Sequence, residues 1–319
     1  MKAYHLYVAS CVKNGGILHY IYKSGKLQKK GKVTCDRPMY LHLRNGSMQV
    51  LLRQPFLNNQ NSGIISYDIT KDGELKQNSR IIDTKGIVAC HLCYFHEKTY
   101  VTNYLSGSIF CTSGKMDIHE GKGKNPVRQD MPHPHYIAPA PDGKCLLSTD
   151  LGLDAIYSYD EELNVLSVSK VPLGHGARHL AYSEDGKTVF CANELKSTVT
   201  VFNYDNGRLV PYETVPVLAR EKDSTVAAIR VKGNYVYVSN RGDDSISCLY
   251  WDGKKLELCS VTPCGGASPR DFLIVEEMLI CANEKGNNVM FFFLENEKVI
   301  DIRMKEEIEV PLCIAAIKI

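Results

Sequence analysis

Residues 177–205 read ARHLAYSEDGKTVFCANELKSTVTVFNYD, three short segments of alternating apolar and polar residues separated by turn signals. Such alternation is typical of half-buried β-strands. The Asp185-Gly186 pair between the first two segments is a strong hairpin signal, and a small polar residue, Asn193, ends the second segment. The stretch therefore predicts a small antiparallel sheet of three or four strands.

The same unit recurs along the whole chain. Each copy starts at a small residue or proline, here called the anchor, which is followed by one variable residue and an alternating strand. The anchors are Pro38, Ala89, Pro134, Ala177, Val226, Pro269 and Pro311. Their spacing of about 45 residues, with three or four strands in each copy, is typical of a β-propeller. Helical arrays of similar period lack both the alternation and the enrichment in Val, Ile, Tyr and Phe.

The two ends of the sequence each carry part of a repeat. The segment PLCIAAIKI at 311–319 resembles a first strand with nothing after it, and residues 3–23 resemble second and third strands without a first. Joining them predicts an all-β, seven-bladed propeller, a single domain over residues 1–319 with one composite blade. Ring closure of this kind removes exposed sheet edges. The alternative, a two-domain β-sandwich, leaves both partial repeats unexplained.

Composition excludes several classes of protein. Apolar residues make up 44% of the 319 residues, and 38 basic against 36 acidic residues give a net charge of +2. This balance predicts no nucleic-acid or membrane partner, and no apolar run approaches the ~20 residues of a membrane span. The N-terminal apolar stretch is too short for a signal peptide, so we expect a cytoplasmic protein, a monomer or weak homo-oligomer, whose twelve cysteines are free thiols.

One cysteine pair has the spacing of a zinc knuckle. Cys90 and Cys93 frame the sequence CHLC, with His96 nearby. The surrounding segment reads as a strand, which would place positions i and i+3 on opposite faces, whereas zinc needs converging ligands. We therefore expect ordinary strand cysteines and no metal site.

The first strand of each propeller blade lines the central channel, so the residue after each anchor recurs at one depth there. These residues are Met39, Cys90, His135, Arg178, Ala227, Arg270 and Leu312. A second ring follows the small polar residue that ends each second strand, and it contains Tyr104, Leu151, Glu194, Arg241 and Glu284. Titratable residues at otherwise apolar repeat positions indicate function.

Each of these side chains also has a structural interpretation. Arg178 and Glu194 could form a buried salt bridge that serves only the fold, and His135 could be a hydrogen-bonded core histidine. Arg270 could pair with Asp271 beside it. Glu284 reads as part of a solvated loop.

Several motifs together resemble one known family. They are HPH at 133–135, DLGLD at 150–154, GHGARH at 174–179, NEL at 193–195, SNRG at 239–242 and PRDF at 269–272. Their order and spacing resemble the seven-bladed lactonases, which include the propeller type of 6-phosphogluconolactonase and the fungal carboxy-muconate cyclase. The chain departs from the family pattern at Ala177, at Ala228 and in LLRQPF at 51–56, which leaves the identity of the lactone open.

The resemblance implies catalytic roles for His135, Arg178, Glu194 and Arg241, and neither a metal nor an organic cofactor. We assign substrate binding to five further residues at or near these motifs, namely His133, His179, Arg270, Asn193 and Asn240. We expect His133 to lie at the mouth of the pocket.

The chemistry expected from these residues is the hydrolysis of a small anionic sugar lactone, with 6-phospho-D-glucono-1,5-lactone as the leading candidate. Imidazole or carboxylate can activate water, so His135 and Glu194 form the expected acid–base pair, and either one can be the base. Guanidinium groups bind anions and stabilise an oxyanion.

Three alternatives remain. The substrate could be another carboxylated lactone, or the chain could be a non-catalytic scaffold. A calcium-dependent lactonase would need carboxylate and amide ligands on the axis, whereas Asp150, Asn193 and Asn240 lie one step outside the central ring.

Overall fold

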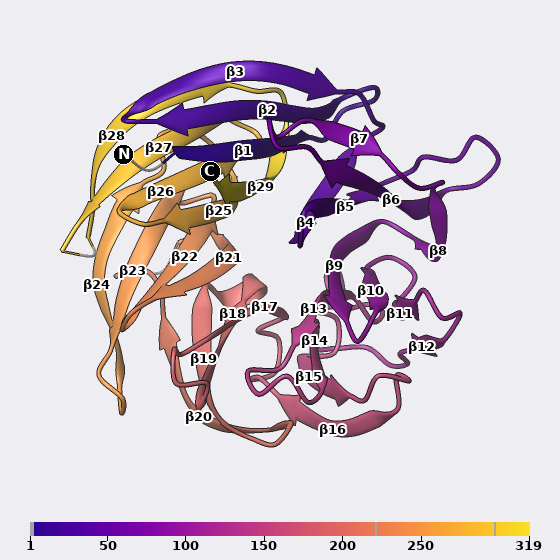
Figure 1. Cartoon of the computed structure of the whole chain (residues 1–319). Helices are drawn as coiled ribbons and strands as arrows, with labels where there is room; N and C mark the ends of the chain where they lie inside the picture. Colours follow the sequence, from indigo (N-terminus) through magenta and orange to yellow (C-terminus); the bar gives the residue numbers. More distant parts are fainter. Residues whose placement is uncertain (1–2, 221, 297) are drawn as a thin grey trace.

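The chain forms seven antiparallel sheets arranged in a ring, as the seven-bladed prediction requires (Figure 1). This computed structural model describes residues 3–220, 222–296 and 298–319. The expected seven-bladed all-β propeller is confirmed. The one helical element among the described residues is a single 3-10 turn, η1 (Glu194–Lys196). None of the described helical structure is long and apolar enough to cross a membrane.

The strands group by sheet. The composite blade has the order β29 (Pro311–Lys318), β1 (Ala3–Ser10), β2 (Gly16–Lys23) and β3 (Lys26–Val33). The next blade contains β4 (Pro38–Arg44), β5 (Ser47–Leu52), β6 (Asn61–Ile69), β7 (Leu75–Gln77) and β8 (Ile82–Ile87). The third blade contains β9 (Ala89–Phe95), β10 (Lys98–Asn103), β11 (Ser108–Cys111) and β12 (Met116–Ile118), and the fourth contains β13 (Pro134–Pro139), β14 (Leu146–Asp150), β15 (Ala155–Tyr159) and β16 (Val165–Lys170). The fifth blade contains β17 (Ala177–Tyr182), β18 (Thr188–Asn193), β19 (Thr198–Asp205) and β20 (Arg208–Pro216), and the sixth contains β21 (Thr225–Lys232), β22 (Tyr235–Arg241), β23 (Ser245–Trp251) and β24 (Leu256–Pro263). The seventh blade contains β25 (Pro269–Val275), β26 (Met278–Asn283), β27 (Asn288–Glu295) and β28 (Lys298–Glu307).

The two ends of the chain share the composite blade. Strand β29 pairs antiparallel with β1, in a register that places Ala315 opposite Tyr7 and Ile314 opposite Val8. Figure 1 shows β1 and β29 side by side in this sheet, next to the yellow strands of the preceding blade. The partial repeats at the two ends are therefore the missing halves of one sheet, as predicted.

The anchors mark the start of the innermost strands. Six of the seven innermost strands begin at the anchor itself, and the seventh, β21, begins at Thr225, one residue before Val226. The predicted hairpin turn at Asp185-Gly186 also forms, and Gly186 adopts a φ of +69°, which glycine tolerates without steric cost.

A β-bulge follows the anchor in every blade, which the alternation of the sequence does not reveal. In β13, Pro134 lies opposite Asp150 and Tyr136 lies opposite Thr149, so His135 is the extra residue. The other six innermost strands break register at the corresponding position. Because a bulge re-aims the extra side chain, the seven residues after the anchors share one orientation relative to the ring axis.

Apolar side chains fill the spaces between neighbouring blades. One cluster joins Phe190 and Val201 to Val236 and Leu249 of the next blade, for example. The CHLC segment lies in β9, where Cys93 and His91 are buried. The twelve cysteines are free thiols, as expected.

Candidate active site

The residues after the anchors surround a small cavity on the ring axis. Six of the seven predicted residues line it, namely Met39, Cys90, His135, Arg178, Arg270 and Leu312. Its volume of about 20 Å³ is enough for a single water molecule. The bulges thus collect one imidazole and two guanidinium groups around one water-sized space.

Glu194 lies beside this cavity and accepts ion pairs from three arginines. Its Oε2 accepts from Arg178 Nε and from Arg241 Nη2, each at 2.9 Å, and its Oε1 accepts from Arg128 Nη2. The carboxylate side chain is only 3% exposed. Arg178 is equally buried, whereas 39% of the Arg128 side chain is exposed. The cluster therefore carries two more positive charges than negative ones and reaches from the buried channel to solvent.

The charges around Glu194 fix its ionisation. Burial alone would raise the pKa of Glu194, but Arg241 and Arg178 hold it well below the ordinary value of a glutamate. Burial, and then Arg241, lowers the pKa of Arg178 to about 9, so this guanidinium remains protonated at neutral pH. A carboxylate held in this way binds protons weakly, which makes it a better anchor for cations than a general base.

His135 is the buried imidazole of the cavity. Its side chain is almost completely enclosed, and its Nδ1 has no hydrogen-bond partner among the described residues. Burial, reinforced by Arg178, lowers the pKa of His135 well below the ordinary value for histidine. His135 is therefore neutral at pH 7 and has a nitrogen available for a water molecule or a substrate.

A layer of aromatic rings fills the channel around His179. The His179 ring centroid lies 5.2 Å from His135 and 5.3 Å from Tyr136, and His91 packs between Tyr40 and Tyr136. His179 Nε2 accepts a hydrogen bond of 3.1 Å from Arg178 Nη1, because a guanidinium can only donate. His179 therefore helps to orient Arg178.

Arg128 was not predicted from the sequence. It belongs to the connection between β12 and β13, which has no counterpart in the repeat pattern. Gln129 beside it donates to Asp154 Oδ1 at 2.8 Å, and Asp154 also accepts from the backbone N–H groups of Gly174 and Gly176 at 2.7 Å each. Gly176 O in turn accepts from Glu194 N at 2.7 Å. Asp154 thus ties the loop of Arg128 to the turn that carries Glu194.

The remaining predicted residues take varied positions. Arg270 lines the cavity and pairs at 3.5 Å with Glu284, not with its neighbour Asp271, which binds Arg230 at 2.6 Å. His133 is buried and stacks on Tyr104 with ring centroids 4.3 Å apart, and so does not lie at an open mouth.

The amides of Asn193 and Asn240 are buried and donate to hydroxyl groups of their own blades. These contacts account for part of their hydrogen-bonding capacity, and a substrate-binding role for either residue stays a prediction.

Glu194→Gln is expected to destabilise the fold. The substitution keeps the shape of the side chain but leaves buried Arg178 without its anionic partner, and breaking a buried ion pair in this way costs about 3–5 kcal/mol. Urea denaturation would measure the loss.

Glu284→Gln is the matched control, since it removes a partly exposed pair with Arg270 and should cost at most about 1 kcal/mol. Equal stability of the two variants would contradict the electrostatic role of Glu194.

Comparisons with known proteins bear on the family and the fold. The model of a family described as "Lactonase, 7-bladed beta-propeller" matches residues 5–315. An uncharacterized protein of Staphylococcus aureus (strain bovine RF122 / ET3-1) is 32% identical over 261 residues, which cover 74% of this chain and 76% of the relative.

Two solved structures are similar throughout. A Bacteroides fragilis protein, a candidate 6-phosphogluconolactonase by its description, has a TM-score of 0.89 at 23% identity, with 98% of both chains covered. The periplasmic gluconolactonase of Pseudomonas aeruginosa has a TM-score of 0.89 at 22% identity, with 99% of both chains covered. At such identities the two structures support the fold alone.

Proposed function

We propose a function from the premise that this chain belongs to the seven-bladed β-propeller lactonase family, which the match over residues 5–315 shows. The proposed reaction is the hydrolysis of an anionic sugar lactone, with 6-phospho-D-glucono-1,5-lactone as the leading substrate. The thiols of its cysteines are free, as in proteins of the reducing cytoplasm, which is the compartment we propose.

The observation that carries the proposal is the charge imbalance around Glu194. Three guanidinium groups share one carboxylate, next to a neutral imidazole and a water-sized cavity. An excess of guanidinium groups favours a substrate with a phosphate or carboxylate group, because these anions accept paired hydrogen bonds from arginine. A neutral ligand would leave the excess charge uncompensated.

The roles follow from the protonation states. We assign the general base to His135, which is neutral and has a free Nδ1, and not to Glu194, whose low pKa makes it a weak base. A water in the cavity gives its proton to His135 as its oxygen bonds to the lactone carbonyl carbon. Arg178 stabilises the resulting oxyanion. When the ring C–O bond breaks, protonated His135 returns the proton to the leaving alkoxide, which leaves a hydroxy acid.

A lactone panel tests the proposal. Acid release above the spontaneous rate should be fastest with 6-phosphogluconolactone, slower with gluconolactone, and should be compared with muconolactone as a carboxylated alternative. Preference for muconolactone would indicate that the natural substrate is another carboxylated lactone. No acceleration with any of the three would contradict the hydrolase and favour a scaffold.

Arg241→Gln and Arg128→Gln are expected to discriminate between charged and neutral lactones. Losing a charge-assisted hydrogen bond removes about 1.5–3 kcal/mol, so kcat/KM for the phosphorylated lactone should fall by roughly 10- to 150-fold. The fall for gluconolactone should be much smaller. Arg208→Gln, on exposed outer strand β20, is the control. An equal loss on both substrates would assign these arginines to the fold or to the oxyanion instead.

A further inference from the structure

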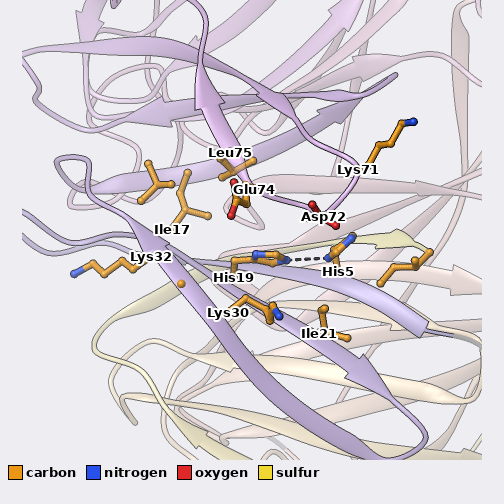
Figure 2. A pocket seen from close by; sticks show the side chains of 13 residues that line it. His5, Ile17, His19, Ile21, Lys30, Lys32, Lys71, Asp72, Glu74 and Leu75 are labelled. Atoms are coloured by element: carbon orange, nitrogen blue, oxygen red, sulfur yellow. Dashed lines mark hydrogen bonds between the residues drawn. The ribbon is translucent and has the colours of Figure 1, made fainter.

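A second, larger cavity lies away from the channel, between the composite blade and the blade of β4–β8. Its volume is about 620 Å³. The connection after β6 and the short strand β7 form one side, and strands β1, β2 and β3 form the other (Figure 2). Strand β7 has only 3 residues, whereas the outermost strands β20, β24 and β28 have 8 to 10. The cavity shares no lining residue with the catalytic channel.

Two histidines lie on this inter-blade surface. His5 and His19 are on the face of β1 and β2 that also carries Tyr7 and Ile17, which pack into an apolar cluster with β4–β6. Both histidines are more than nine-tenths buried, and their rings hydrogen-bond to each other, Nδ1 of His5 to Nε2 of His19, at 2.9 Å. Two buried polar rings next to an apolar inter-blade cluster indicate a function beyond packing.

The position of the pair is tightly defined. Gly73 adopts φ of +78°, and a Cβ atom at this position would lie 2.4 Å from His5 Nδ1. The hydroxyl of Tyr7 donates to Gly73 O at 2.7 Å, and the Tyr7 ring stacks on His19. The turn around Gly73 therefore closes over the two imidazoles, and a side chain there would displace them.

The pair joins two imidazole rings through one nitrogen of each. Burial lowers the pKa of His5, and contact with the Lys71 backbone partly opposes this shift. Since a neutral imidazole has one N–H, one ring donates in the pair and the other accepts. Burial lowers the pKa of His19 to about 4, so the ring is neutral. The other nitrogen of this ring, Nδ1, takes no part in the pair.

Charges of opposite sign occupy opposite walls. Figure 2 shows Asp72 and Glu74 on one side of the histidine pair and Lys30 on the other, with Lys32 farther along the same strand. Within the described part of the chain, none of these four side chains forms an ion pair. Lys71 extends away from the pair, and Ile319 completes the lining. The walls thus offer separate places for a cation and an anion.

We propose that this cavity binds a small zwitterion that carries both an ammonium and a carboxylate group, of which an α-amino acid is the simplest example. The ammonium group faces Asp72 and Glu74, beside the histidine pair. The carboxylate faces Lys30 and Lys32. The site is independent of the proposed lactone hydrolysis.

Histidine side-chain NMR tests the proposal on the intact protein. The ¹³Cε1–¹H signals of His5 and His19 are followed while each of the twenty common L-amino acids is added, with acetate and methylammonium as probes of the separate charges. At least one amino acid should shift the His19 signal with saturation, and the single-charge probes should bind at least 10-fold more weakly. No saturable shift, or an equal response to acetate alone, would overturn the proposal.

Charge-removing variants supply the second readout. Glu74→Gln and Lys30→Met should each weaken binding of the responding amino acid by at least 10-fold. Lys29→Met, which changes an exposed neighbour outside the lining, should not. Lactone hydrolysis should be unchanged in all three variants. Unaltered binding in Glu74→Gln and Lys30→Met would overturn the proposed charge recognition, whatever the outcome for lactonase activity.

Discussion

His135→Asn is expected to lower turnover of the susceptible lactone by about 10²–10⁴-fold, the usual contribution of a general acid–base group. Asparagine cannot accept and return the proton of the attacking water. Because His135 Nδ1 has no protein partner among the described residues, the substitution breaks no internal hydrogen bond at that atom. Folding should therefore survive, and near-UV circular dichroism of the variant should match that of the wild type.

The pH profile provides the accompanying measurement. A base must be deprotonated to act, and burial lowers the pKa of His135 below the ordinary histidine value of 6.5. We therefore expect kcat/KM to stay level as the pH falls to about 6.5 and to decline only at lower pH. The asparagine variant should lose this acidic limb. Wild-type turnover in His135→Asn, with the limb intact, would show that another group is the base.

The repeat pattern made most of the fold predictable. Hydrophobic alternation and the anchors located the innermost strands, and the partial repeats at the ends implied the composite blade. The same regularity brought His135, Arg178 and Arg270 to one depth of the channel, because each follows an anchor and occupies the same bulge. Ring symmetry converts equal positions in the repeat into neighbouring positions in space, so even blades distant in sequence could be aligned.

What the repeat does not encode could not be predicted. Arg128 reaches Glu194 from a connection that has no equivalent in the other blades. The repeat pattern therefore could not predict that the two residues lie close together. The alternative interpretation, in which Arg270 pairs with Asp271, is not what the structure shows, for a related reason. The bulge directs Arg270 into the channel towards Glu284, while Asp271 faces Arg230 of the preceding blade. A bulge re-aims its extra residue relative to the next one along the strand, so adjacency in sequence does not make Arg270 and Asp271 partners.

Deletion of residues 311–319 is expected to abolish cooperative folding, although only a short terminal segment is lost. Strand β29 is the innermost strand of the composite blade and pairs with β1, so its removal exposes the edge of β1 to the channel. It also removes Leu312 and Ile314, which are 5% and 6% exposed. Burying two such side chains contributes about 3–6 kcal/mol, a large fraction of the roughly 5–15 kcal/mol that stabilises a typical domain.

Loss of the strand should have a further effect, because it opens the ring. The blades on either side of the gap would then lose a packing partner, since β29 contributes Leu312 to one inter-blade cluster and Cys313 and Ala315 to another. The truncated chain should show no sharp thermal transition and should expose apolar surface to a hydrophobic dye. Deletion of Ile319 alone, which removes one backbone hydrogen bond to Ala3, is the control and should melt close to the wild type. A truncated protein with an unchanged melting transition would mean that the composite blade does not close the ring.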